Sequence, residues 1–189
     1  MIVREATAAD VRAVAHVQVE SWRAAYRGIL DEELLQTLSV EDKQSYWLQW
    51  FLRNEPSRFM RVIDDAARGV GFAVAGPARG REPAAPDLPL VGEIYVLYLL
   101  PRVQRRGWGT QLMRSMARGL RQRGMEAMLL WVLQRNRPAC RFYEALGGAP
   151  AYRRRTTVGR QQLVEIGYLW DDLDLLAGPS LPASQPGIS

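Results

Sequence analysis

The chain has 189 residues, of which 48% are hydrophobic and 24% charged, and this composition fits one folded domain with its own core. The formal net charge is +5, and because Lys43 is the one lysine, nearly all the positive charge is arginine, which suits a phosphorylated cofactor or a nucleic acid. No apolar run approaches the ~20 residues of a membrane span, the first residues lack an apolar h-region, and Cys140 is the one cysteine. We therefore expect a cytoplasmic protein with no signal segment, no internal disulfide and no membrane partner.

The first 75 residues predict two strands in a hairpin, preceded by a short strand and two helical stretches. The periodicity of apolar residues separates the helices from the strands. The predicted elements are a strand at 2–6, a helix at 7–26, a helical stretch at 31–54, and strands at 58–64 and 69–75.

The second half predicts a βαβα unit followed by two more strands. Residues 91–100 are almost continuously apolar, as a central strand covered on both faces should be. The elements after it are a helix at 109–123, a strand at 126–133, a short helix from 138 to 146, and strands near 150–158 and 162–170. A βαβ unit requires a parallel strand pair, whereas hairpins are antiparallel, so the fold class is α/β with a mixed central sheet. The Pro- and Gly-rich end, 176–189, predicts a disordered tail.

The turn between the central strand and its helix, QRRGWGT at residues 104–110, is a candidate phosphate site. A helix N-terminus offers free N–H groups and a positive dipole end, and glycines let the backbone approach an anion closely. The turn is neither a P-loop nor a dinucleotide fingerprint, since GxxxxGK[ST] is absent and Leu112 fills the third glycine position. Tight packing of helix against strand is the alternative explanation of these glycines.

Two segments resemble the GNAT superfamily of acetyl-CoA-dependent N-acetyltransferases. LYLLPRVQRRGWGTQLM, residues 97–113, is similar to the acetyl-CoA-binding segment with its Q/R-x-x-G-x-G/A signature. NRPACRFYEALGG, residues 136–148, resembles the second block of the family, N-x-x-A-x-x-F-Y-E-x-x-G. The resemblance implies a single GNAT-like domain over residues 1–175. It also implies an acyltransferase that moves an acetyl group from acetyl-CoA directly to a primary amine.

The resemblance also implies where acetyl-CoA binds. In the family, a bulge splits the central strand, and pantetheine adds to the strand edge while an N–H near Leu99 polarises the thioester carbonyl. The implied cofactor-binding residues belong to the strand end, the turn and the second block: Leu97, Tyr98, Leu99, Gln104, Arg105, Arg106, Gly107, Trp108, Gly109, Thr110, Asn136 and Tyr143. The alternative for the strand is a regular buried strand without a bulge.

Two residues of the second block have implied roles of their own. Tyr143 matches the tyrosine that donates a proton to the leaving thiolate, and Asn136 matches the asparagine that binds the pantetheine arm. The alternatives are an aromatic core residue for Tyr143 and a helix cap for Asn136.

Glu93 is the candidate base. Its position, eleven residues before Gln104, resembles that of the glutamate that acts through water in the histone-type branch. A carboxylate in an apolar strand is costly to bury, and the alternative is a solvated group at the start of the strand. The ribosomal-protein-modifying branch has its glutamate on the next strand, where this chain has Trp131.

The acceptor site is expected near Trp22 and Tyr26, which lie four residues apart on one helical face, although core packing is the alternative for Trp22. The acceptor is a small-molecule or peptide amine whose identity the sequence does not reveal. Rival functions are a CoA-binding GNAT module without catalysis and a basic nucleic-acid-binding protein, but a nucleic-acid motif is lacking, and no residues have metal-ligand spacing. Monomer and homodimer both stay open.

Overall fold

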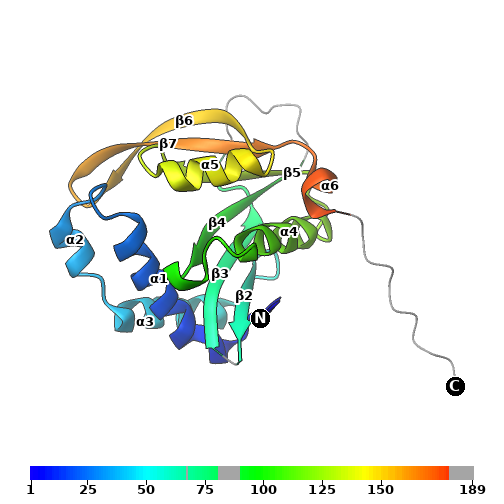
Figure 1. The fold of residues 1–189 in the computed structure, drawn as a ribbon. Helices are drawn as coiled ribbons and strands as arrows, with labels where there is room; N and C mark the ends of the chain where they lie inside the picture. Colours follow the sequence, from blue (N-terminus) through cyan, green and yellow to red (C-terminus); the bar gives the residue numbers. More distant parts are fainter. Residues whose placement is uncertain (67, 81–89, 179–189) are drawn as a thin grey trace, which may run out of the picture.

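The structure is a computed structural model that describes residues 1–66, 68–80 and 90–178. A seven-stranded sheet in the order β1-β2-β3-β4-β5-β7-β6 is flanked by helices (Figure 1). The strands are β1 (Ile2–Glu5), β2 (Phe59–Asp65), β3 (Arg68–Pro77), β4 (Val91–Leu99), β5 (Ala127–Leu133), β6 (Ala149–Val158) and β7 (Gln161–Trp170). The α-helices are α1 (Val11–Ala25), α2 (Glu32–Gln36), α3 (Val40–Arg53), α4 (Trp108–Arg121), α5 (Arg137–Ala145) and α6 (Leu173–Ala177).

The sheet is mixed, as the sequence predicted. β4 and β5 run parallel and are joined through α4, whereas every other neighbouring pair of strands is antiparallel. The crossover is needed because two parallel strands cannot be connected by a tight turn. It also brings the β4–α4 turn and the start of α5 to the same end of the sheet (Figure 1).

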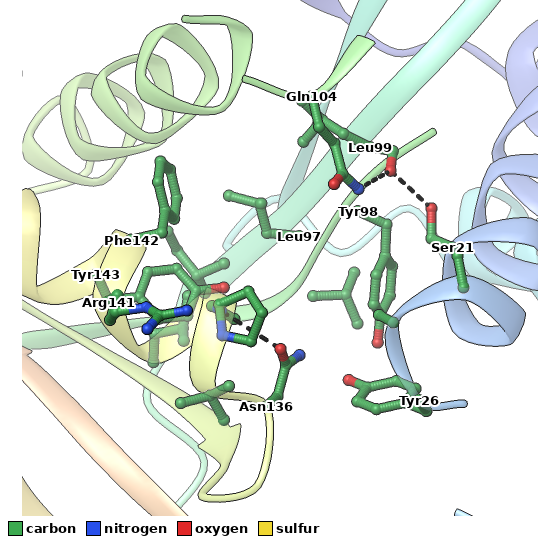
Figure 2. Close-up of a pocket in the computed structure, with 18 of the residues that line it drawn as sticks. Ser21, Tyr26, Leu97, Tyr98, Leu99, Gln104, Asn136, Arg141, Phe142 and Tyr143 are labelled. Atoms are coloured by element: carbon green, nitrogen blue, oxygen red, sulfur yellow. Dashed lines mark hydrogen bonds between the residues drawn. The ribbon is translucent and has the colours of Figure 1, made fainter. Parts of the chain in front are cut away.

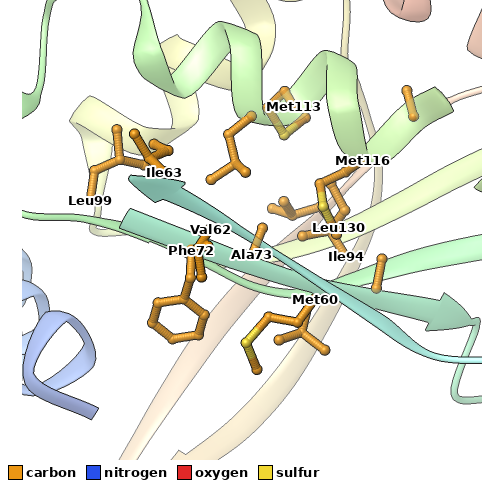
Figure 3. Close-up of a cluster of buried hydrophobic side chains, with 14 of the residues drawn as sticks. Met60, Val62, Ile63, Phe72, Ala73, Ile94, Leu99, Met113, Met116 and Leu130 are labelled. Atoms are coloured by element: carbon orange, nitrogen blue, oxygen red, sulfur yellow. The ribbon is translucent and has the colours of Figure 1, made fainter. Parts of the chain in front are cut away.

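The core fills both faces of this sheet (Figure 3). Met113 and Met116 of α4 are fully buried on one face. On the other face, the ring of Phe72 meets Trp47 of α3 edge to face at 5.4 Å between centroids. The indole Nε1 of Trp47 donates to Gln18 of α1 at 2.8 Å, so α1 and α3 form one layer against the sheet.

The stretch predicted at 31–54 is two helices rather than one. α2 ends at Gln36, and Ser39 caps α3 by accepting a hydrogen bond from the backbone N–H of Asp42 at 3.0 Å. The guanidinium of Arg23 donates to the carbonyl of Leu38 at 2.9 Å in the break. Helical periodicity continues across this break, which is why periodicity alone did not reveal it.

The predicted boundary between the domain and the C-terminal tail, at residue 176, is wrong. Residues 176 and 177 lie in α6 and are buried, so the predicted tail does not begin at 176. Arg118 of α4 donates to the carbonyl of Ala177 at 2.9 Å, which fixes this helix to the domain. Residues 179–189 of the predicted tail lie outside the described residues. Among the described helices, none is both long and apolar enough to cross a bilayer.

Candidate active site

The central strand contains a bulge. Val74 pairs with Val96 and Ala75 pairs with Ile94, so Tyr95 is an extra residue on β4. β4 pairs with β5 only from residue 91 to residue 94, and past the bulge the two strands separate. The bend therefore opens a gap in the sheet in which the edge of β4 has no neighbouring strand.

A cavity of about 820 Å³ occupies this gap. Its walls come from α1, β4, the β4–α4 turn, β5 and α5 (Figure 2). Of the residues predicted for the site, those that line the cavity are Tyr26, Leu97, Tyr98, Leu99, Gln104, Arg105, Asn136 and Tyr143. Segments far apart in the sequence thus meet at the place where β4 loses its neighbour.

The backbone of β4 presents alternate hydrogen-bonding groups to the gap. The N–H of Leu100 donates to Val70 of β3 at 2.9 Å, so the alternation of an antiparallel ladder directs the N–H groups of Leu97 and Leu99 away from β3. The same alternation directs the backbone of Tyr98 toward β3. The prediction of backbone contacts therefore fits Leu97 and Leu99, while Tyr98 offers the cavity its side chain.

The carbonyl of Leu99 is held by two side chains. Ser21 Oγ of α1 donates to it at 3.1 Å, and Gln104 Nε2 donates to it at 2.9 Å (Figure 2). These bonds fix the end of β4 relative to α1 and to the turn. No motif in the sequence marked Ser21, because its partner is 78 residues away.

Tyr143 lies on α5, is buried and lines the cavity. Its ring packs on Tyr168 at 5.8 Å and edge to face on Trp170 at 6.2 Å. Burial raises the pKa of the Tyr143 hydroxyl, so this group stays protonated at neutral pH. The ring is therefore part of the core, while the residue also lines the cavity with its hydroxyl in the protonated form.

Asn136 is the N-cap of α5, where its Oδ1 accepts from the backbone N–H of Ala139 at 3.3 Å. The residue is buried and also lines the cavity. The cap fixes the orientation of the amide, which leaves its Nδ2 available as a donor. The helix-cap reading is thus confirmed, and it is compatible with binding a ligand.

The β4–α4 turn has the backbone shape of an anion site. Gly107, the N-cap of α4, has φ +82°, and a Cβ built there would meet no atom within 4 Å. Arg105 also has a positive φ, +59°. Gly109 is different, because a Cβ there would lie 3.0 Å from the ring of Phe142 on α5. The second glycine therefore allows α4 to pack closely against α5, which differs from the packing of helix against strand that was considered for these glycines.

The remaining residues of the turn, Arg106, Trp108 and Thr110, are not among those that line the cavity. They belong to the start of α4 and the residue before its N-cap, next to the cavity mouth at Arg105. Contact of these three residues with a phosphate group stays a prediction.

Tyr26 and Trp22 have different surroundings. Tyr26 lines the cavity, and burial raises the pKa of its hydroxyl. Trp22 does not line the cavity; it packs edge to face behind Tyr26 at 5.1 Å and against a small apolar cluster around Leu30 and Leu133. The placement supports core packing for Trp22 and a substrate contact for Tyr26 alone.

Glu93 is buried, with 3% of the residue exposed, rather than solvated. Both carboxylate oxygens accept hydrogen bonds from Arg79: Oε2 from the backbone N–H at 2.9 Å, and Oε1 from Nη2 at 2.6 Å. The guanidinium of Arg79 also stacks over Tyr95, the bulge residue, at 4.2 Å. Glu93 is not among the residues that line the cavity, so any proton it takes must arrive through water.

No group of three or more His, Cys, Asp or Glu among the described residues is placed to hold a metal ion. The residues of the site that sequence reasoning missed are Ser21, Arg79 and Arg141, the last of which lines the cavity from α5. Ser21 and Arg79 stand in no motif, and Arg141 lies within the block at 136–148 but at a position that its pattern leaves open.

Comparison with known sequences agrees with this geometry. Residues 87–157 match the FR47-like protein family, and this range includes β4, α4, β5 and α5. YuaI of Bacillus subtilis, named an uncharacterized N-acetyltransferase, is 31% identical over 174 residues, which are 92% of this chain and 95% of that protein. A mycothiol acetyltransferase of Arthrobacter sp. (strain FB24) is 28% identical over 132 residues, 68% of this chain but 38% of that longer protein.

Solved structures share the fold. The PaiA N-acetyltransferase from Thermoplasma acidophilum, in complex with coenzyme A, aligns with a TM-score of 0.67 at 20% identity, over 87% of this chain and 96% of that one. YncA of Salmonella typhimurium, a putative acetyltransferase with acetyl-CoA, aligns with a TM-score of 0.67 at 18% identity, over 97% and 98% of the two chains. At these identities the likeness concerns the fold.

Proposed function

The chain belongs to the GNAT superfamily of N-acetyltransferases, and from this premise we propose that it transfers the acetyl group of acetyl-CoA directly to a primary amine. The observation that supports this proposal most is the gap between β4 and β5. It exposes the backbone of β4 next to a buried tyrosine hydroxyl and a helix N-terminus. An acyl carrier with a long polar arm and a phosphorylated end needs these three features together.

The described residues fit acetyl-CoA. The N–H of Leu97 faces the gap and would bind the pantetheine arm as an added strand would, with Asn136 Nδ2 as a further donor, while the N–H of Leu99 faces the same gap nearer the turn. The N-terminus of α4, with its open space at Gly107 and the charge of Arg105 beside it, would hold the pyrophosphate. The cavity volume of about 820 Å³ lies within the range of small-molecule sites.

The reaction needs an activated carbonyl, a free amine and a protonated leaving group. Acetyl-CoA supplies the thioester. In this proposal the N–H of Leu99 donates to the carbonyl oxygen as negative charge develops on it during attack by the amine nitrogen. The C–S bond then breaks, and the Tyr143 hydroxyl gives its proton to the sulfur. Its raised pKa suits a donor that must stay protonated until the thiolate forms.

The amine loses its proton through water to Glu93 in this proposal. The carboxylate lies on β4 within the buried strand, and Arg79 fixes its orientation through both oxygens. Tyr95 lies between Glu93 and Leu97 in the strand and lines the cavity, so in this proposal the water passes beside Tyr95.

Two measurements on the purified chain test the function. Calorimetry with acetyl-CoA, NAD and ATP should show binding of acetyl-CoA in preference to the other two. Release of free thiol from acetyl-CoA should then depend on an added primary amine. A chain that binds acetyl-CoA but releases no thiol with any amine class would be a binding module, and absence of acetyl-CoA binding would refute the proposal altogether.

A further inference from the structure

The acceptor end of the cavity has aromatic walls and no free acidic group. Besides the aromatic residues of α5, four aromatic residues line the cavity: Tyr26, Tyr95, Tyr98 and Trp131. Among the described residues that line it, none is Asp or Glu, and the charged ones are Arg105 and Arg141. A second ammonium group on a substrate would therefore meet no carboxylate in the wall, although it would lose much of its hydration on entry.

Aromatic faces can also bind cations, but two of these four rings already bind arginines. The guanidinium of Arg79 lies 4.2 Å from the ring centre of Tyr95, and that of Arg154 lies 3.9 Å from the ring centre of Trp131. Each of these two arginines also forms an ion pair with a carboxylate. Arg79 binds Glu93 at 2.6 Å, and Arg154 binds Glu165 at 2.7 Å. The nearby negative charges are thus already neutralised from within the protein.

The loop after α1 is fixed by hydrogen bonds to two other segments. Arg135, next to the cavity residue Asn136, donates to the carbonyl of Gly28 at 2.9 Å. Gln161, at the start of β7, accepts from the backbone N–H of Asp31 at 2.8 Å. These bonds join the segment that follows Tyr26 to the β5–α5 loop and to the β6–β7 hairpin. Three segments are therefore held together beside the part of the cavity wall that Tyr26 and Asn136 form.

We infer that the acceptor is a compact monoamine with an apolar or aromatic body and no second cationic group. This inference rests on the proposed acetyl transfer and adds the class of acceptor to it. Polyamines and other polycationic amines are poor acceptors because no carboxylate among the described lining residues balances their additional charges.

Hexylamine and 1,6-diaminohexane test the charge argument, since they differ by one ammonium group at equal chain length. Thiol release from acetyl-CoA should give a kcat/KM at least about tenfold higher for hexylamine, and 2-phenylethylamine should also be acetylated. Acetyl-CoA binding is measured on the same preparation, because its absence would refute the proposed function itself. If acetyl-CoA binds, an equal or higher kcat/KM for the diamine, or no turnover of either monoamine, overturns the inference about the acceptor.

A variant should reverse the preference. Arg154→Gln uncovers the face of Trp131 and leaves Glu165 without its partner, so kcat/KM for 1,6-diaminohexane should rise by about tenfold relative to hexylamine. Arg153→Gln is the matched control, because it removes the same charge from the neighbouring residue, which points to the opposite face of β6. If both variants change the ratio equally, general charge and not the Arg154 contact sets the preference, and the inference fails.

Discussion

The guanidinium of Arg79 covers the carboxylate of Glu93, with Nη2 of the arginine 2.6 Å from Oε1 of the glutamate. The side chain of Glu93 is 4% exposed and that of Arg79 is 54% exposed, so the arginine lies on the solvent side of the ion pair. Arg79 also stacks on Tyr95, the extra residue of the β4 bulge. One ion pair thus connects the proposed base to the distortion that opens the cavity.

Glu93→Gln should separate a base from a purely structural carboxylate. We expect kcat/KM at pH 7 to fall by about 10²-fold and to recover in part as pH rises, because more of the amine is then free of its proton. Acetyl-CoA affinity should not change. Arg79→Gln breaks the same ion pair but keeps the carboxylate, so its kcat/KM should fall much less. Profiles of rate against pH that coincide for Glu93→Gln and the unmodified chain would show that Glu93 only supports the bulge.

Tyr143→Phe should lower kcat with little loss of stability. The substitution keeps the ring that packs on Tyr168 and Trp170 and removes only the hydroxyl. Loss of a general acid typically costs about 10²-fold in rate. Tyr168→Phe is the control, because it removes a hydroxyl that donates to Glu144 at 2.6 Å and does not line the cavity. That variant should lose stability, and an equal loss of kcat in both would assign Tyr143 to the core alone.

Gly107→Ala should abolish binding of acetyl-CoA, and Gly124→Ala should not. Both glycines have a φ near +80°, both have open space where a Cβ would lie, and they flank α4 at opposite ends. Each substitution should therefore cost a similar ~1–2 kcal/mol of unfolding free energy from backbone strain. Only the methyl group at position 107 would point into the proposed phosphate site. Calorimetry with acetyl-CoA on both variants would measure this difference, and equal affinities would exclude the turn as the phosphate site.

Local patterns predicted most of the fold. The strands and helices follow from apolar periodicity with small errors at their ends, and the parallel β4–β5 pair follows from the helix between two buried strands. The break between α2 and α3 was missed because helical periodicity continues across it, and the residue that binds carbonyl groups at the break, Arg23, lies outside the stretch. α6 was missed because it is short and its burial depends on contact with α4.

The site was predicted only in part, because some of its residues stand in local motifs and others meet only through the tertiary fold. Tyr143, Asn136 and the β4–α4 turn stand in motifs, and the structure brings them to one cavity. Pairing between strands determines the bulge at Tyr95, and no local pattern reports it. Arg79, which binds the carboxylate of Glu93, lies fourteen positions earlier in the chain, so no short motif contains both residues.

Asp10 should make stability depend on pH in the acid range. The residue is 8% exposed, and its carboxylate accepts two hydrogen bonds from the guanidinium of Arg4, at 2.7 and 2.9 Å, and one from the backbone N–H of Thr7 at 2.8 Å. The hydrogen bonds from Arg4, more than any other contact, lower the pKa of Asp10 below its usual 3.8. Arg4 also binds Asp64 of β2, so the ion pair joins β1 and β2 to the start of α1.

A carboxylate whose pKa is lower in the folded state stabilises the fold fully above the pKa of the unfolded chain. That contribution is lost as the pH falls from about 3.8 through the lower pKa of the folded state. Asp10→Asn should therefore lower the unfolding free energy by about 1–3 kcal/mol at pH 7, the magnitude expected of a partly buried ion pair. The difference in unfolding free energy between Asp10→Asn and the unmodified chain should become smaller as urea denaturation is repeated from pH 5 down to pH 2.5. A constant gap over that range would mean that Asp10 stabilises the fold in a way that does not depend on its charge.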